Sequence, residues 1–338
     1  MPNLLPQPYL LFLADVDVPN RAKTAAGLAH WVPDRCVGQF RLPRCAADVG
    51  LKELTPAQAA AAGARAMVIG VAPQGGAIPE RWHEALLAAL DAGLHLISGM
   101  HTRLSDIPEL VARARDCARE LYDVRHTDRE IPSANGRRRS GKRCLMVGLD
   151  SALGKKYTAL SLTRALSDAG VPATFRATGQ TGIMIAGEGI AVDAVVADFV
   201  AGAAELISPA NEPDHWDVIE GQGSIFHAAY SGVSAGLLHG SQPDAMVLCG
   251  HATRDHLELL PHIAHRDYGE AIAVHEALAR VTNPGARVIG ISVNTAELPT
   301  EAAETMLGDL QTRVGLPVTD PVRFGCAPLV DAMLMGEA

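Results

Sequence analysis

The clearest chemical signature lies in one segment, Gly148 to Thr158, which reads GLDSALGKKYT. An apolar run precedes it and an amphipathic stretch follows, so a glycine-rich turn leads from a strand into a helix. Backbone N–H groups of such a turn point toward a phosphate, the helix start adds partial positive charge, and Lys155 adds a full charge. The segment predicts a phosphate-binding loop. The residues expected to contact its ligand are Gly148, Asp150, Ser151, Gly154, Lys155, Lys156, Tyr157 and Thr158.

The spacing within this loop departs from the usual Walker pattern. Five residues separate Gly148 from the Gly154–Lys155 pair, where the pattern has four. Lys156 stands where a Ser or Thr hydroxyl normally ligates Mg²⁺, and Thr158 comes two residues later. The sequence therefore favours phosphate binding over Mg²⁺-dependent ATP hydrolysis, and no metal site is expected.

Two further polar segments follow predicted strands of the same domain. The first holds Arg176, Gln180 and Thr181 after the apolar run 173–178. The carboxyl edge of a parallel sheet is where ligands bind in open α/β folds. An arginine there can pair with a carboxylate or a phosphate, so all three residues are candidate substrate contacts.

The second segment begins at Glu220, at the end of the run 216–221, and reaches His227. Glu220 stands where P-loop proteins hold a metal-binding or base carboxylate, and the pKa of histidine suits a general acid or base. Both are candidate catalytic residues. The alternative is a helix-start turn with His227 merely exposed. The candidate substrate contacts within this segment are Gly221, Gln222 and Ser224.

Two more arginines are candidates for gripping substrate carboxylates. Arg254 follows the apolar run 245–250, and Arg103 follows the run 94–98 in the first half of the chain. Both can equally be ordinary strand-end residues.

The elements that must position these residues alternate between buried strands and amphipathic helices, which predicts α/β domains with parallel sheets. Strands are expected at 9–14, 67–72, 94–98, 144–149, 173–178, 216–221, 245–250 and 286–294. Helices are expected at 79–92, 107–121, 155–169, 191–207, 228–239, 269–281 and 299–313.

The 338 residues suit two domains, 1–130 and 144–338, joined by a linker at 131–143. That linker is polar and carries the basic run Arg137–Arg139, Lys142 and Arg143, interpreted here as a solvated connection.

The composition of the chain indicates which kinds of molecule it is expected to bind. A net charge of −9 argues against nonspecific nucleic-acid binding, which needs a basic face. The six cysteines form no CxxC pair and no zinc spacing, and no apolar stretch reaches membrane-spanning length. We expect a cytoplasmic protein with reduced thiols that binds small molecules, not nucleic acid or membrane, and that forms a homo-oligomer.

A series of motifs resembles one family across nearly the whole chain. The series is KTAAGL with VGQ, GMHTRLSD, GLDSALGKKYTAL, ATGQTGI, DFVAGAAE and IEGQGSIFHAAYSGVSAGLLHGSQPDA, and it resembles the DUF1611 family. The loop is also similar to that of dethiobiotin-synthetase-like proteins. The resemblance implies a Rossmann-like N-terminal domain and a P-loop NTPase-like C-terminal domain. The family includes bacterial D-glutamate N-acetyltransferases, and the Lys-Lys-Tyr-Thr end of the loop looks like that branch.

The resemblance therefore implies transfer of an acetyl group from acetyl-CoA to the amine of D-glutamate. Such a reaction needs a base for the ammonium, donors for the oxyanion and cations for two carboxylates. Glu220 or His227 is the expected base, the amides of 221–224 the donors, and the arginines the clamps. No acyl-enzyme is required, and Cys249 is expected to be core.

Two other functions remain open from the sequence. One is an ATP- and Mg²⁺-dependent ligase or kinase of the dethiobiotin-synthetase type, in which Glu220 with Thr158 or Asp150 holds the metal. The other is a nucleotide-sensing or scaffold protein without catalysis.

Overall fold

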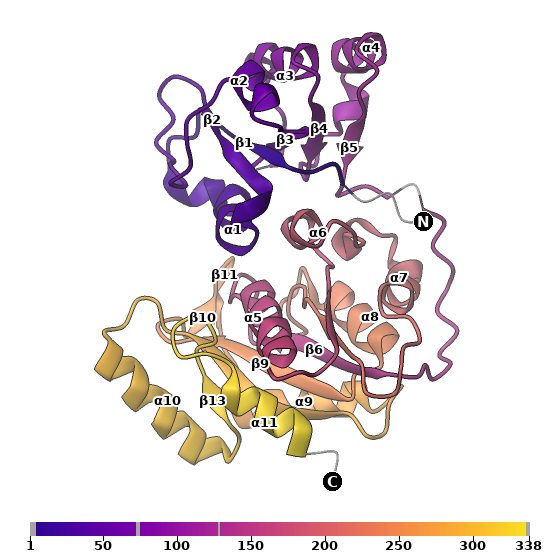
Figure 1. Cartoon of the computed structure of the whole chain (residues 1–338). Coiled ribbons are helices and arrows are strands. Elements are labelled where there is room, and N and C mark those ends of the chain that lie inside the picture. The colour runs from indigo at the N-terminus through magenta and orange to yellow at the C-terminus, as the bar shows by residue number, and fades with distance from the viewer. Residues whose placement is uncertain (1–4, 72–74, 128, 336–338) are drawn as a thin grey trace. The chain divides into compact units, whose positions relative to one another are not determined.

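The computed structural model describes residues 5–71, 75–127 and 129–335 (Figure 1). The chain forms two compact α/β units. The first runs to Arg129 and also takes in Gln180–Ala191; the second comprises the remainder. The α/β class with parallel sheets, predicted from the alternating runs, is confirmed in both units.

The first unit is built on a five-stranded parallel sheet with the strand order β2-β1-β3-β4-β5. Its strands are β1 (Tyr9–Ala14), β2 (Cys36–Arg41), β3 (Ala66–Ile69), β4 (His95–Ser98) and β5 (Leu121–Asp123). Its helices are α1 (Lys23–Trp31), α2 (Pro56–Ala61), α3 (His83–Asp91), α4 (Pro108–Asp116) and α6 (Gln180–Ala186). The predicted strand 67–72 ends at Ile69, and its last residue lies outside the described ranges. The predicted helix 107–121 ends at Asp116, because β5 follows.

Helix α6 belongs to the first unit, although the sequence placed residues 180–191 inside the domain 144–338. Its apolar residues Ile183, Met184 and Ile185 are buried. The Tyr9 hydroxyl donates to the Met184 carbonyl oxygen at 3.2 Å, and Arg35 Nη1 donates to the Ile185 carbonyl oxygen at 3.1 Å. These contacts fasten α6 to elements more than 140 residues earlier in the chain.

The second unit is built on a six-stranded parallel sheet with the order β13-β12-β9-β6-β8-β7. Its strands are β6 (Lys142–Gly148), β7 (Ala173–Arg176), β8 (Trp216–Ile219), β9 (Ala245–His251), β12 (Arg287–Asn294) and β13 (Val318–Thr319). Its helices are α5 (Lys155–Asp168), α7 (Val200–Ile207), α8 (Ser231–Ser241), α9 (Tyr268–Ala279), α10 (Thr300–Val314) and α11 (Ala327–Met335). Helices α5 and α11 lie on one side of this sheet, with α8 and α9 on the other (Figure 1).

Strand β6 lies between β8 and β9, so the segments that follow these three strands meet at one edge of the sheet. A short antiparallel hairpin, β10 (His256–Leu257) and β11 (Leu260–Ala264), follows β9. Cys249 in β9 is fully buried, which confirms its assignment to the core. Within the described residues, no helix has the length and apolar character needed to cross a membrane.

The predicted helix over 191–207 is wrong in its first half. Two short 3-10 turns, Val192–Ala194 and Ala197–Phe199, precede α7. The Val192 N–H donates to the Thr178 carbonyl oxygen at 3.0 Å, and Val196 is extended with ψ of 137°. Both features interrupt a helical ladder, so α7 starts only at Val200.

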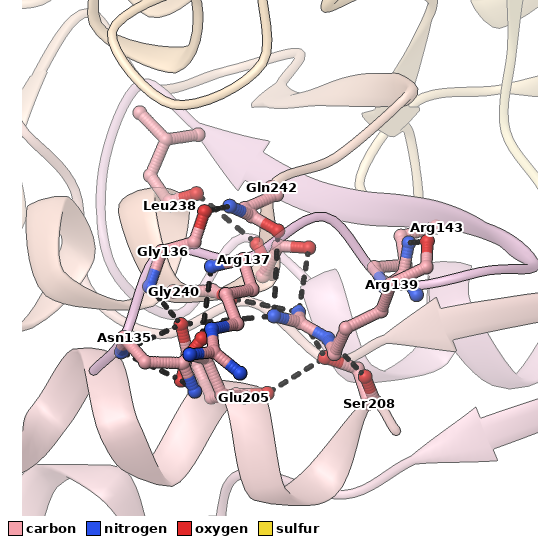
Figure 2. Close-up of polar contacts among 12 residues, drawn as sticks. Asn135, Gly136, Arg137, Arg139, Arg143, Glu205, Ser208, Leu238, Gly240 and Gln242 are labelled. Atoms are coloured by element: carbon pink, nitrogen blue, oxygen red, sulfur yellow. Dashed lines mark hydrogen bonds and ion pairs between the residues drawn. The ribbon is translucent and has the colours of Figure 1, made fainter. Parts of the chain in front are cut away.

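The interpretation of 131–143 as a solvated linker is wrong for Arg143, which is buried, and several other residues of the segment have partners in the second unit. The Glu205 carboxylate on α7 accepts hydrogen bonds from the backbone N–H groups of Asn135 and Gly136, at 3.0 and 2.9 Å, and from the Asn135 side chain (Figure 2). Arg139 Nη1 lies 3.8 Å from the same carboxylate. We call these four residues the Glu205 cluster.

Two of the four arginines of this segment, Arg139 and Arg143, are largely or fully buried, whereas Arg137 and Arg138 are exposed. Arg139 donates to the carbonyl oxygens of Ser208 and Gly240, each at 2.8 Å, and burial lowers the pKa of Arg139 to about 10, with the charge of Arg143 adding to the effect (Figure 2). The Arg143 side chain is fully buried and donates to the Ser140 carbonyl oxygen at 2.8 Å. These partners lie on distant elements, so sequence alone shows only a run of basic residues.

Candidate functional site

The predicted phosphate loop follows β6 and leads into α5. Gly154 adopts the left-handed conformation with φ of 97°, a position that favours glycine, and Lys155 begins the helix. Lys155 is 6% exposed, and its Nζ donates to the Asp150 carbonyl oxygen at 2.7 Å within the loop. Burial lowers the pKa of Lys155, while the nearby Cys249, Asp150 and Glu220 oppose that shift. The first N–H groups of a helix have no intrahelical acceptor, so this loop places a buried cation beside the positive end of a helix.

Lys156 and Tyr157 continue the first turn of α5. Lys156 Nζ lies 4.8 Å from the centroid of the Tyr157 ring, a cation–π contact. Burial raises the pKa of the Tyr157 hydroxyl.

Thr158 has an internal partner. Its Oγ1 lies 2.8 Å from Ser292 Oγ on β12, and its side chain is buried. The hydroxyl that the sequence left open as a metal ligand is therefore part of the contact between α5 and β12.

Asp150 is fully buried and fastens the β10–β11 hairpin to the loop. Its Oδ1 accepts from the Ser151 N–H at 2.6 Å, its Oδ2 accepts from the Glu258 N–H at 2.8 Å, and His265 Nε2 lies 3.6 Å away. Both carboxylate oxygens are thus occupied by protein donors. The hairpin carries no strong sequence signal, and its role at the loop was not predicted.

We expect Asp150→Asn to loosen the hairpin without unfolding the unit, because an amide NH2 then faces one of the two N–H donors. The amide protons of residues 256–264 should exchange about 10–100-fold faster, as loss of one buried acceptor costs about 1–3 kcal/mol. Hydrogen exchange read by mass spectrometry measures this directly. Asp309→Asn is the control, because Asp309 is exposed on α10 and should leave exchange of the hairpin unchanged.

Glu220 follows β8 and faces the segment that follows β7. Its Oε2 accepts from the N–H groups of Thr178 and Gly179, both at 3.0 Å, and the Thr178 hydroxyl donates to the Glu220 carbonyl oxygen at 2.6 Å. The side chain is 4% exposed, and burial raises the pKa of Glu220 against the opposing effects of Lys156 and the two N–H groups. Among the described residues, none donates a hydrogen bond to Oε1. The sequence pointed to Glu220 but not to its two amide donors.

Gly179 packs closely against this carboxylate and against Gln222. A Cβ atom added to Gly179 would lie 2.6 Å from Gln222 Nε2 and 3.3 Å from Glu220 Oε1. Gln222 Nε2 also donates to Thr178 Oγ1 at 3.1 Å. A side chain at position 179 would therefore displace the Gln222 amide.

The glycine-rich turn after Glu220 is held against the phosphate loop. A Cβ atom at Gly221 would lie 1.7 Å from the Met146 carbonyl oxygen and 2.9 Å from Lys155 Cδ, so only glycine fits. Ser224 Oγ lies 2.9 and 3.0 Å from the carbonyl oxygens of Gly148 and Leu149. These contacts bring the predicted loop and the predicted turn into one site.

His227 is buried, 1% exposed, so the alternative of an exposed histidine is wrong. Its Nδ1 accepts from the Ala229 N–H at 3.2 Å, which leaves the ring hydrogen on Nε2. The ring stacks on Tyr230 with centroids 4.4 Å apart. Nε2 is buried without a hydrogen-bond partner in the described part of the chain. In this arrangement the Nε2–H of His227 is a hydrogen-bond donor.

The two candidate arginines of the second unit, Arg176 and Arg254, already have acidic partners. Arg176 Nε donates to Asp217 Oδ1 at 2.7 Å, and Asp217 is buried. Arg254 Nη1 lies 3.2 Å from Glu258 Oε2 on the hairpin. The structure does not bring Arg176 to the phosphate loop, since its guanidinium pairs with a residue near the start of β8.

The other three predicted contacts lie in the first unit. Thr181 Oγ1 is 3.0 Å from Thr24 Oγ1, and Gln180 packs against Gly99, where an added Cβ would lie 2.7 Å from Gln180 Cβ. Arg103 precedes the short turn Leu104–Asp106.

The fold and the loop define an α/β protein with a P-loop domain. The family model described as a domain of unknown function, DUF1611_C P-loop domain, matches residues 131–330, and the DUF1611_N Rossmann-like domain matches residues 41–127. The chain belongs to the DUF1611 family.

Relatives and a solved structure cover nearly the whole chain. A D-glutamate N-acetyltransferase of Tritonibacter scottomollicae is 48% identical over 98% of this chain and 99% of its own length. One of a Pseudoalteromonas species is 41% identical over 96% and 97%. The crystal structure of a DUF1611 family protein from Anabaena variabilis is similar with a TM-score of 0.87 and 33% identity, covering 97% of this chain and 99% of that one. With these relatives, the chain is an enzyme of the acyltransferase class.

Proposed function

We propose that the protein transfers the acetyl group of acetyl-CoA to the amino group of D-glutamate, in the catabolism of D-amino acids. Two relatives of the same length carry that activity in their names. The structural observation that carries the proposal is the pairing of a phosphate loop with a buried carboxylate, Glu220, whose hydrogen bonds from the described residues fall on Oε2. The loop suits the phosphates of CoA, and the carboxylate suits a proton acceptor.

In the proposed reaction, Glu220 accepts a proton from the bound ammonium group. The amine nitrogen then forms a bond to the thioester carbonyl carbon and gives up its second proton as the C–S bond breaks, and the leaving thiolate takes up that proton. Backbone N–H groups of 221–224 and the Nε2–H of His227 are the available oxyanion donors on this chain. His227 is not the base, because its Nδ1 lone pair is occupied by Ala229.

An ATP- and Mg²⁺-dependent reaction is supported less well. It would draw on Thr158 and Asp150, whose oxygens are engaged by Ser292, Ser151 and Glu258.

The first test is free-thiol release from acetyl-CoA by the purified protein, with D-glutamate, L-glutamate or no amino acid, each with and without EDTA. The proposal expects release that needs D-glutamate and is unaffected by EDTA. Release abolished by EDTA, or no release with any amino acid, would contradict it.

A further inference from the structure

We infer that Thr178 is a positioning residue for Glu220, because its hydroxyl occupies the Glu220 carbonyl oxygen and leaves the Thr178 N–H to hold the Glu220 carboxylate. The inference rests on the proposed function, in which Glu220 accepts a proton from the substrate. It adds a residue that fixes where that carboxylate lies.

The pairing of β7 with β8 is interrupted at Thr178. The two strands pair in parallel up to Arg176 and Ile219, and the Glu220 N–H continues the ladder by donating to the Arg176 carbonyl oxygen at 3.0 Å. In a regular parallel ladder, the next bond runs from the Thr178 N–H to the Glu220 carbonyl oxygen. Here the Thr178 hydroxyl donates to that carbonyl oxygen at 2.6 Å, and the Thr178 N–H donates to Glu220 Oε2 at 3.0 Å. The two side chains have therefore taken over the last step of the ladder.

Thr178 is itself held firmly. Its side chain is fully buried, and its Oγ1 accepts from Gln222 Nε2 at 3.1 Å. Its carbonyl oxygen accepts from the Val192 N–H at 3.0 Å. Residues 180–191 belong to the first unit and Val192 to the second, so this bond ties Thr178 to the point where the chain re-enters the second unit. Thr178 is thus fixed through both its backbone and its side chain, and it fixes Glu220 in turn.

This arrangement makes the position of the carboxylate depend on one hydroxyl group. Without that hydroxyl, the buried Glu220 carbonyl oxygen would lack a donor, which is costly, and the Thr178 N–H would replace it as in a regular ladder. Of the two N–H groups on Oε2, the carboxylate would then keep only that of Gly179. Burial raises the pKa of Glu220 and the two N–H groups oppose that shift, so loss of one of them raises the pKa further.

Thr178→Val removes the hydroxyl at nearly constant volume, and Thr178→Ser keeps it. In the valine variant, the acidic limb of the pH–rate profile for acetyl transfer should move up by about one pH unit or more, the effect of one hydrogen bond to a charged group. The serine variant should keep the wild-type limb. The charges of Lys155, Lys156 and Asp193 also act on Glu220, and neither variant alters them. A valine variant with the wild-type limb would overturn the inference.

Thr319→Val is the matched control. Thr319 is also buried, and its hydroxyl donates to a backbone carbonyl oxygen, that of Gly325, at 2.9 Å. It lies on β13, at the opposite edge of the sheet from β7. The control should leave the acidic limb where it is in wild type, so a shift in both valine variants would point to a general loss of stability and contradict a special role for Thr178.

A direct titration separates failure of this inference from failure of the proposed function. Carbon-13 NMR of protein labelled at the glutamate carboxyl carbons measures the pKa of Glu220 without turnover, and the signal missing from Glu220→Gln assigns it. A higher pKa in Thr178→Val but not in Thr178→Ser supports the inference even where no acetyl transfer occurs. Equal pKa values in wild type and both variants overturn it. Thr178→Ala carries the same expectation and replaces the valine variant if that protein does not fold.

Discussion

Glu220→Gln is expected to lower kcat for acetyl transfer about 10²–10⁴-fold, the range that a positioned general base contributes. The amide keeps the size of the side chain and one oxygen for the N–H groups of Thr178 and Gly179, so the local fold is retained. The Kd for CoA should change less than about two-fold, because the Lys155 loop is not altered. Single-turnover kinetics with CoA binding measured in parallel checks both. Unchanged turnover would remove Glu220 from the mechanism.

The pH dependence of acetyl transfer also tests the assignment of Glu220 as the base. Burial raises the pKa of Glu220 above its ordinary value, and the base must be ionised to act. Activity should therefore fall as the pH decreases through that raised pKa, at a higher pH than for an exposed glutamate.

His227→Asn is the companion variant. Its Oδ1 can replace Nδ1 as the acceptor for the Ala229 N–H, and the acidic limb of the profile should persist. A limb that disappears in His227→Asn would make His227 the base.

Local signals in the sequence predicted the parts of the fold that depend on neighbouring residues. Strands such as 9–14 and 245–250 are continuous apolar runs, and the phosphate loop is marked by Gly148, Gly154 and Lys155 within a few positions. The same is true of Glu220, which directly follows strand β8 and precedes the turn Gly221-Gln222-Gly223.

The parts that the sequence did not show depend on partners far along the chain. The apolar residues of α6 indicate burial but not which sheet covers them, and they pack in the first unit. The partner of Arg176 is Asp217, 41 residues later, so a side chain expected to hold substrate proves to be internally paired. Likewise, nothing near Asp150 indicates that residues of the hairpin use its carboxylate.

Glu205→Ala is expected to reduce the free energy of unfolding by about 3–5 kcal/mol, the cost of removing one partner from a buried ion pair. Three N–H donors of Asn135 and Gly136 would lose their acceptor, and the buried Arg139 guanidinium would lose its counter-charge. Urea unfolding followed by circular dichroism measures the loss. Glu304→Ala, on the exposed face of α10, is the control and should change stability by less than about 0.5 kcal/mol.

A double-mutant cycle with Arg139→Met distinguishes a buried pair from two independent contacts. If the Glu205 cluster is one unit, the two single changes together should cost less than the sum of each alone, by about 0.5–3 kcal/mol. The cluster also matters to the site, because Glu205 lies on α7 and α7 packs tightly against α8. A Cβ atom at Gly240 of α8 would lie only 2.0 Å from the Ala201 carbonyl oxygen of α7. Helix α8 begins directly after the turn that carries Gln222 and His227. If Glu205→Ala and Arg139→Met each leave the free energy of unfolding unchanged, residues 135–139 are the solvated connection expected from the sequence.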